Sequence, residues 1–261
     1  MNIVVCLKQV PGTTEVKIDP KTNSLIRQGI PNIINPFDTY ALEEGVRLKE
    51  KSGGKVTVIT MGPPQADAAL REAISLGADE TILLSDRAFA TADTWATANT
   101  LAAAIKKLGQ CDIIICGRQT VDGDTGQVGP EMAEMLGIPF IAYVSKIEEI
   151  KDKYLRVTRA VEDGHEVIET TLPAVITVAK EINVPRLPSL RGIMKSKSAK
   201  ITTWTNKELG LDPNTVGLAG SSTQVMKVFF PQRVSKAEIL SGEIASQVDT
   251  LVDILKEARL L

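Results

Sequence analysis

The sequence predicts an α/β protein built on a doubly wound, mostly parallel sheet with helices on both faces. Its short runs of β-branched residues are apolar at nearly every position, as in strands that are covered on both faces. Segments with helical periodicity lie between these runs, and this alternation favours a parallel sheet. With 261 residues, the chain is long enough to bury a substantial core. The predicted strands are residues 2–8, 55–60, 81–85, 112–116, 139–144 and 173–179.

Three segments between the strands have the apolar spacing of amphipathic helices. Residues 38–51 carry apolar side chains on one face and charges on the other. Residues 65–78 repeat this pattern and stop at Gly77, and residues 91–109 end in Lys-Lys-Leu-Gly. Glycine is common where a helix ends, because it accepts a left-handed conformation. These segments therefore supply the helical layers of the predicted sheet.

Two segments depart from the alternation and are predicted to be β-hairpins. Residues 15–29 contain an Asp-Pro and a Thr-Asn pair, which favour turns. Residues 153–173 are predicted to turn at Asp163-Gly164, a pair typical of tight hairpins. The second hairpin is expected as an excursion from the main sheet.

The character of the chain changes after Ala179. The residues that follow are rich in proline and basic side chains, and a polar, glycine-rich linker comes after them. The sequence thus predicts an α/β domain over residues 1–205 and, over residues 206–261, a linker with a C-terminal helical arm.

The end of this arm, residues 235–261, has the pattern of one long amphipathic helix. Ser235 and Glu238 have the spacing of a capping box, in which each side chain bonds to the other residue's backbone amide. Apolar residues then recur at helical spacing down to Leu255. We expect this stripe to pack on the chain's own domain or on a partner subunit.

Composition excludes several classes of function. Lys plus Arg total 30 and Asp plus Glu total 32, so the chain has no excess positive charge for nucleic acid. Three cysteines are too few for a disulfide framework, and the N-terminus enters a strand without a signal sequence, so we expect a soluble, cytoplasmic protein. No apolar run has the ~20 residues needed for membrane insertion. Because His165 is the only histidine, Ser-His-Asp catalysis and histidine-based zinc sites lack parts, and we expect no metal site.

The most informative segment is the glycine-rich loop over residues 117–128, between a predicted strand and a predicted helix. In open α/β sheets, ligands bind beyond the carboxyl ends of the strands. The glycines allow backbone amides to point inward, and the helix start near Gln127 adds partial positive charge. Together they form an anion seat suited to a phosphate. The side chains able to donate hydrogen bonds to a phosphate or a ribose are Gln119, Thr120, Thr125 and Gln127.

Two aspartates keep the role of this loop open. Asp122 and Asp124 would repel an adjacent phosphate, so they suit ribose hydroxyls, turn capping or solvent. A glycine-rich turn that binds nothing is the alternative. The chain has no Walker lysine, no dinucleotide fingerprint and no group resembling an activated nucleophile. If a nucleotide binds here, the chemistry belongs to the cofactor and no residue of this chain is catalytic.

Two other predicted loops strengthen the case for a ligand. Residues 30–44 contain Asn-Pro before a helix, for which Asp38 or Thr39 is the predicted N-cap. Residues 60–65 follow another strand, where the backbone can meet an adenine edge. In a doubly wound sheet both segments can face the same crevice as the 117–128 loop.

Several motifs together resemble the beta (small) subunit of electron-transfer flavoprotein. They are VCLKQVP, INPFDTYALEEGVRLKE, GRQTVDGDTGQVGPEMAEMLGIP, and LPAVITV with the later PRLPSLRGIMKSKSAKI. The resemblance runs from Met1 to Lys200. It implies an adenine-nucleotide-hydrolase-like α/β domain and a C-terminal arm that packs on an alpha subunit.

The resemblance also implies a nucleotide that is held for electron transfer and not hydrolysed. Its adenosine monophosphate part is expected against the ends of several strands. The implied cofactor-binding residues are Cys6, Asn35, Pro36, Phe37, Asp38, Met61, Gly117, Arg118, Gln119, Thr120, Val121, Asp122, Gly123, Asp124, Thr125, Gly126, Gln127 and Val128.

Three functions remain open within this interpretation. Asp38 in NPFD and the DGDTGQVGPE run look most like the electron-bifurcating form, in which a complete FAD occupies the beta subunit. There, NADH reduces this flavin, one electron goes to ferredoxin or flavodoxin, and the other passes through the alpha-subunit FAD to an acyl-CoA dehydrogenase-type enzyme. In the common form, the beta subunit binds AMP structurally. The third alternative is a nucleotide-binding regulatory module.

The segment PRLPSLRGIMKSK is implied to dock the dehydrogenase. Its prolines are expected to keep a loop extended, with Leu190 as an apolar anchor. Arg186, Arg191 and Lys195 are expected as a basic rim that steers encounter. The alternative is that Leu190 folds back on its own domain.

Overall fold

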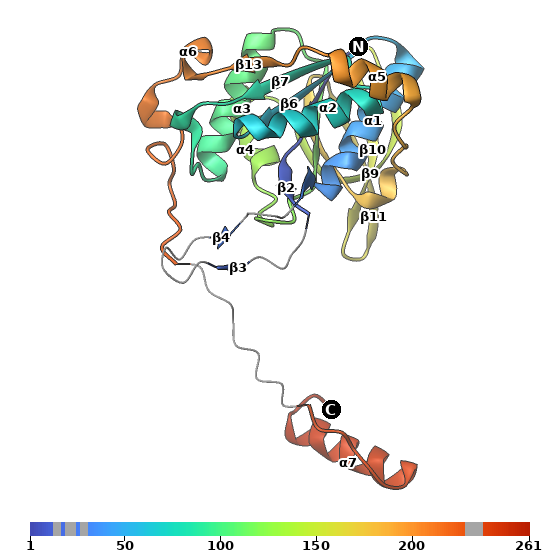
Figure 1. Ribbon diagram of the computed structural model, residues 1–261. Coiled ribbons are helices and arrows are strands. Elements are labelled where there is room, and N and C mark those ends of the chain that lie inside the picture. Colours follow the sequence, from blue (N-terminus) through green and yellow to red (C-terminus); the bar gives the residue numbers. More distant parts are fainter. Residues whose placement is uncertain (13–16, 19–24, 27–30, 228–236) are drawn as a thin grey trace. The chain divides into compact units, whose positions relative to one another are not determined.

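The computed structural model describes residues 1–12, 17–18, 25–26, 31–227 and 237–261. The chain forms two compact units, Met1–Met226 and Lys227–Leu261. Figure 1 shows the first unit as a sheet with helices on both faces and the second as the helix α7 (Ile244–Glu257).

In the described part of the chain, the first unit is built on one nine-stranded sheet. In spatial order its strands are β11 (Gly164–Thr171), β10 (Tyr154–Val161), β9 (Phe140–Lys151), β12 (Ala174–Val178), β8 (Ile113–Gly117), β1 (Asn2–Cys6), β6 (Lys55–Met61), β7 (Glu80–Leu84) and β13 (Thr202–Trp204). All neighbours from β9 to β13 are parallel, whereas β10 and β11 are antiparallel. The predicted doubly wound, mostly parallel sheet is confirmed.

Helices cover both faces of this sheet, and an apolar core lies under each layer. The first layer contains α1 (Pro36–Ser52), α2 (Asp67–Leu76) and α5 (Leu190–Ser198), which packs on α2. The second contains α3 (Thr94–Leu108), α4 (Val128–Leu136) and the short α6 (Asn206–Leu209). Single helical turns are η1 (Pro64–Ala66), η2 (Arg87–Phe89), η3 (Lys180–Ile182) and η4 (Pro213–Thr215).

The start of α1 differs from the prediction. Asn35 is the N-cap and Pro36 is the first helical residue, so the predicted caps Asp38 and Thr39 lie inside the first turn. Proline suits this place because its missing N–H would be unpaired there and its φ is already helical. Asp38 becomes free to face the interior of the molecule.

The two predicted hairpins are found with changes. Lys17–Ile18 (β3) and Leu25–Ile26 (β4) pair antiparallel, whereas the predicted turn residues lie outside the described residues. The β10–β11 hairpin turns at Glu162-Asp163, one residue earlier than predicted, since Val161 pairs with Gly164. A small separate ladder joins β2 (Gln9–Pro11) to β5 (Asn32–Ile34).

The first unit extends beyond the expected boundary at 205/206. Strand β13 pairs with β7, and the residues after it pack on the second helical layer. Val216 is buried there, and Asn99 Nδ2 donates to the Thr215 carbonyl at 3.0 Å. Residues 206–226 therefore belong to the α/β unit, and the second unit begins only at Lys227.

The second unit contains a shorter helix than the sequence predicts. Helix α7 begins at Ile244 behind the N-cap Glu243, because Gly242 has a φ of +110° that interrupts a helix. The predicted cap Ser235 lies outside the described residues. Within this unit, Ile244, Val248 and other stripe residues are exposed.

Membrane insertion was not expected from the sequence. Among the described residues, no helix combines the length and the apolarity that a membrane span requires.

Candidate functional site

The strand order reverses between β1 and β8. The chain leaves β1 toward β6 and β7 on one side, and then returns to β8 on the other. Loops that follow the carboxyl ends of such a pair diverge, and ligands of open α/β sheets bind there. The loop after β8 is the one singled out from the sequence, so the topology puts it at the expected location.

Asn35 fastens this loop to the start of α1. Its side chain is fully buried, and its Nδ2 donates to the Gln119 carbonyl at 2.9 Å. Its Oδ1 accepts from the Val121 amide at 3.1 Å, and its own amide donates to the Lys8 carbonyl at 2.8 Å. One amide side chain thus joins the segments that follow β1 and β8 to the N-terminus of α1.

Asp38 is a buried carboxyl beside the same junction. Its Oδ2 accepts from the Lys8 amide at 2.7 Å. A Cβ on Gly117 would lie 2.3 Å from Asp38 Oδ1, so only glycine allows this close approach. Burial raises the pKa of Asp38 to about 7, although hydrogen bonds from Lys8, Asn35 and Gly117 oppose the rise.

The loop backbone is left-handed at two positions. Gly126 has a φ of +64° and Asp124 a φ of +56°, and the Asp124 amide donates to the Thr120 carbonyl at 2.8 Å. Gly123 is not among the positive-φ residues, so the conformational need predicted for the loop glycines applies to Gly126 and not to Gly123. Asp124 fits this geometry because aspartate tolerates the left-handed region better than most residues.

The two loop aspartates have partners within the chain. Asp122 forms an ion pair with Lys8 Nζ at 2.8 Å, and Asp124 Oδ1 accepts from the Gln119 side chain. Burial would raise the pKa of Asp122, but its bonds to Lys8 outweigh burial and lower it. Lys8 was missed in the sequence, because its partner is far along the chain and no motif joins them. It brings a positive charge to a loop that has no Walker lysine.

Arg118 lies between two aromatic rings. Its guanidinium is 5.4 Å from the centre of the Phe37 ring and 5.3 Å from that of Tyr143. The Arg118 amide donates to the Val178 carbonyl at 3.2 Å, which joins the first residue after β8 to β12. Tyr143 was not predicted as a site residue, since its position on β9 gave no signal in the sequence.

The far end of the loop meets the N-termini of two helices. Gln127 precedes α4, as predicted, and Thr94 begins α3. Thr94 Oγ1 donates to Glu131 Oε1 at 3.0 Å and lies 3.4 Å from Gln127 Oε1. Burial raises the pKa of Glu131, and its Oε2 is buried without a hydrogen-bond partner. Thr94 and Glu131 are further candidates that sequence reasoning missed.

Cys6 and Met61 are at the ends of adjacent strands. Cys6 pairs with Ile59 on β6 and with Cys116 on β8, and both thiols are buried. A hydrogen bond with Cys116, together with burial, raises the pKa of Cys6 well above its ordinary value. Cys6 is therefore a neutral thiol packed in the second core. Met61 is half-buried over the second core.

The docking segment is a non-helical loop over residues 183–189, as expected around its prolines, but from Leu190 on it is a helix. Leu190 begins the helix α5, behind the N-cap Ser189, and its side chain is 83% exposed. Arg191 is also exposed, whereas Arg186 bonds to Glu43 and Lys195 Nζ donates to the Ala78 carbonyl at 3.2 Å. Two of the three predicted rim charges are thus engaged inside the chain.

Comparison with known proteins gives the family. A family model described as "Electron transfer flavoprotein domain" matches residues 22–209. The chain belongs to this family. It is 52% identical to the electron transfer flavoprotein subunit beta of Thermoanaerobacterium thermosaccharolyticum, over 100% of both chains. It is 49% identical to the caffeyl-CoA reductase-Etf complex subunit CarD of Acetobacterium woodii over 100% of both chains, and 45% identical to protein FixA of Azotobacter vinelandii over 93% of this chain and 89% of that protein.

The chain is therefore an electron transfer flavoprotein beta subunit, with a role in electron transfer. This match sets aside the alternative of a regulatory module. The family is associated with flavins and nucleotides, and the residues gathered after β1 and β8 suit such a group. They combine loop amides, a helix N-terminus, the cation Lys8 and an unpartnered carboxylate oxygen on Glu131.

Proposed function

We propose that this beta subunit binds a complete FAD beyond the carboxyl ends of β1 and β8 and acts in electron bifurcation. The observation that carries the proposal is the buried Asn35–Asp38 turn bonded to the 117–128 loop, which brings loop amides and the Lys8 ammonium to one place. The bifurcating form is supported by the NPFD and DGDTGQVGPE runs, which resemble that form of the family.

Each group has a separate part in holding the nucleotide. Lys8 and the amides around Gly126 supply positive charge and donors for phosphate. Asp122 would release Lys8 when the phosphate arrives. The free Oε2 of Glu131 and the side chain of Gln127 are suited to ribose hydroxyls. The remaining residues named from the sequence form the walls around these contacts.

The chemistry supplied by a bound FAD is acceptance of a hydride from NADH and release of single electrons. The protein contributes binding and orientation, and no residue is assigned a proton-transfer role. One electron is proposed to reach ferredoxin or flavodoxin. The other is proposed to pass through an alpha-subunit FAD to an acyl-CoA dehydrogenase-type enzyme. A relative named as part of a caffeyl-CoA reductase complex supports a CoA-ester enzyme as partner.

Two surfaces serve the partners in this proposal. The exposed apolar stripe of α7 packs on the alpha subunit, and the exposed Leu190 of α5 docks the dehydrogenase. A cytoplasmic location agrees with the soluble carriers that such a reaction needs.

The second candidate is a beta subunit that binds AMP structurally. It is favoured by one observation, namely that the cluster of donors is concentrated where a phosphate and a ribose would lie, which AMP alone can fill. In that case single electrons move only through the alpha-subunit FAD, and NADH is not the donor.

A coupled assay under anaerobic conditions tests the proposed function. The heterodimer is mixed with NADH, ferredoxin and an acyl-CoA dehydrogenase, with or without an enoyl-CoA. We expect ferredoxin reduction that depends on the enoyl-CoA. NADH that stays unoxidised under all conditions would contradict the proposal and favour the AMP-binding alternative.

A further inference from the structure

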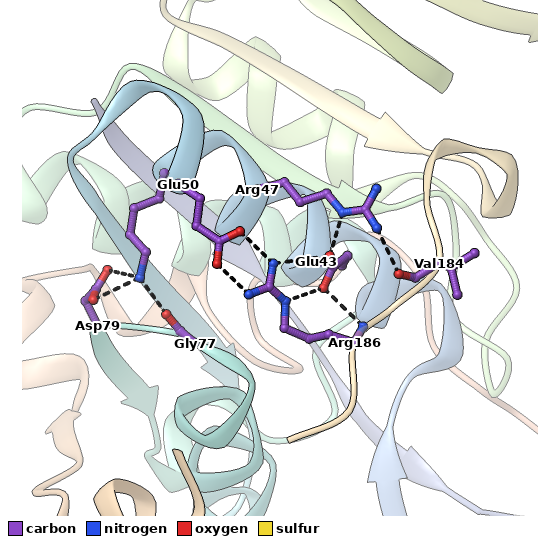
Figure 2. Close-up of polar contacts among 8 residues, drawn as sticks. Glu43, Arg47, Glu50, Gly77, Asp79, Val184 and Arg186 are labelled. Atoms are coloured by element: carbon purple, nitrogen blue, oxygen red, sulfur yellow. Dashed lines mark hydrogen bonds and ion pairs between the residues drawn. The ribbon is translucent and has the colours of Figure 1, made fainter. Parts of the chain in front are cut away.

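A short strap, residues 183–186, lies along α1 and is bonded to it through side chains of both segments. Asn183 Nδ2 donates to the Tyr40 carbonyl at 3.1 Å and to Glu44 Oε2 at 2.9 Å. Arg47 Nη2 donates to the Val184 carbonyl at 3.1 Å, as Figure 2 shows. The strap is therefore tied to α1 before the chain reaches the docking helix α5.

Arg186 is the strongest of these ties. Its Nε and its backbone amide both donate to Glu43 Oε2, at 2.8 and 3.1 Å. Its two terminal nitrogens donate to the two carboxylate oxygens of Glu50, at 2.6 and 2.9 Å. Figure 2 shows the guanidinium between the two carboxylates. The planar fork of arginine suits this two-carboxylate geometry, and lysine would not reproduce it.

Glu43 is a buried carboxylate that needs Arg186 as one of its two cationic partners. Its side chain is only 4% exposed, and its other oxygen accepts from Arg47 Nε at 2.5 Å. Burial alone would raise the pKa of Glu43, but the hydrogen bonds from Arg186 and Arg47 outweigh it and lower the pKa. A buried carboxylate that loses one of its cations is left poorly compensated.

The other end of the segment is fixed to α2. Arg71 Nη1 donates to the Ser196 carbonyl at 2.8 Å. A Cβ on Gly192 would lie 2.2 Å from the Ser75 carbonyl oxygen, so α5 touches α2 through a bare backbone. Helix α5 is thus attached to α2 at Gly192 and at Ser196.

Between these two attachments, three large apolar side chains face solvent. Leu187, Leu190 and Met194 are 89%, 83% and 73% exposed. Leu190 and Met194 are four residues apart in α5 and so share one face of the helix. Leu187 follows Arg186 directly, so its location depends on the strap.

We propose that Arg186 is a positioning residue: its ion pairs with Glu43 and Glu50 fix the strap so that Leu187 lines up with Leu190 and Met194 as one preformed apolar face for the dehydrogenase. This inference rests on the docking role in the proposed function. It assigns Arg186, whose side chain is 32% exposed, to ion pairs within the subunit and not to the charged rim. A preformed face lowers the cost of ordering on binding.

The test compares Arg186→Gln with Arg191→Gln in the complete heterodimer. For Arg186→Gln we expect the carrier concentration for half-maximal dehydrogenase reduction to rise about tenfold, with an unchanged limiting rate and unchanged flavin content. Its salt dependence should equal that of the wild type, because the lost contact is internal. Arg191→Gln, at an exposed position, should instead reduce the salt dependence. Hydrogen exchange at residues 184–190 should be faster only in Arg186→Gln.

Each other outcome overturns the inference. Wild-type exchange and wild-type half-saturation in Arg186→Gln would show that the strap needs no arginine. An altered salt dependence like that of Arg191→Gln would make Arg186 a direct contact. If the Arg186→Gln protein cannot be purified in folded form, the same measurements are made on Glu50→Gln and Arg186→Lys, for which we expect the same changes. A wild-type protein that reduces no dehydrogenase would refute the proposed function, while the exchange comparison would still test the strap.

Discussion

Asp38 offers a direct pH test at the scale of single residues. Its folded-state pKa is raised to about 7 from an ordinary value of 3.8, because the carboxyl is buried. A raised folded pKa means that its contribution to stability is complete below pH 3.8 and is lost as the pH rises through 7. Asp38→Asn keeps the shape of the side chain without its charge. The free energy of unfolding of this variant, relative to that of the wild type, should therefore increase from pH 5 to pH 8. Denaturant unfolding at both pH values measures this, and a difference independent of pH would contradict it.

The loop glycines give a matched pair of substitutions. Gly126 has a positive φ and its Cβ would lie 3.3 Å from the Arg118 carbonyl, whereas a Cβ on Gly123 meets only Thr120 Oγ1 at 3.5 Å. We expect Gly126→Val to cost about 1–3 kcal/mol of stability and to abolish nucleotide binding. Gly123→Val should retain the nucleotide. Equal nucleotide content in both purified variants would show that the loop is a turn without a role in nucleotide binding.

Lys8 gives a test of the charge in the loop. Its Nζ pairs with Asp122 and is partly exposed, so the pair itself contributes at most about 1 kcal/mol to stability. A charged hydrogen bond to a phosphate is worth about 1.5–3 kcal/mol. Lys8→Met should thus weaken the binding of AMP or FAD by roughly tenfold to a hundredfold with little change in melting temperature. Titration calorimetry measures the affinity, with Lys106→Met on α3 as control, and equal affinities would exclude a phosphate contact for Lys8.

The sequence predicts the site's backbone better than its side-chain contacts. The glycine-rich loop and the Asn-Pro turn are local patterns, and both are found at the switch between β1 and β8. Lys8, Thr94 and Glu131 act through partners that only the folded sheet brings near. Such long-range pairs leave no periodic or compositional signal, so they could not be foreseen.

At the scale of elements, α5 is the main difference from the sequence prediction. Prolines at 185 and 188 favoured an extended loop, and that loop ends at Ser189, which caps a helix and accepts from the Gly192 amide at 3.0 Å. The helix has only nine residues and contains Gly192, so its stability comes from packing on α2 and not from intrinsic propensity. By contrast, α1, α2 and α3 were predicted within a few residues because their apolar faces are long and periodic.

Helix α5 also gives a prediction for docking. Leu190→Ala should leave flavin content and NADH-driven flavin reduction unchanged and should weaken transfer to the dehydrogenase by about 1.5–3 kcal/mol. The melting temperature should stay the same, since Leu190 is 83% exposed. Steady-state reduction of the dehydrogenase against carrier concentration measures the effect. Wild-type transfer together with a lower melting temperature would make Leu190 a structural residue and end its docking role.

At the scale of the whole molecule, strand and helix alternation was sufficient to predict the doubly wound sheet. The limits of the first unit were not predicted, because residues 206–226 look like a polar linker and are nevertheless anchored by long-range contacts. Asp93 illustrates this: its amide donates to Ser221 Oγ at 2.8 Å, and its Oδ2 accepts from the Thr223 amide at 2.9 Å. Scattered polar anchors of this kind have no pattern in the sequence.

The proposed function requires that this beta subunit bind a flavin of its own. The most direct measurement is the cofactor content of the heterodimer copurified with its alpha subunit, with flavin measured by absorbance and adenine nucleotides by chromatography after denaturation. We expect two flavins and no AMP per heterodimer. One flavin with one AMP per heterodimer would contradict the proposed function.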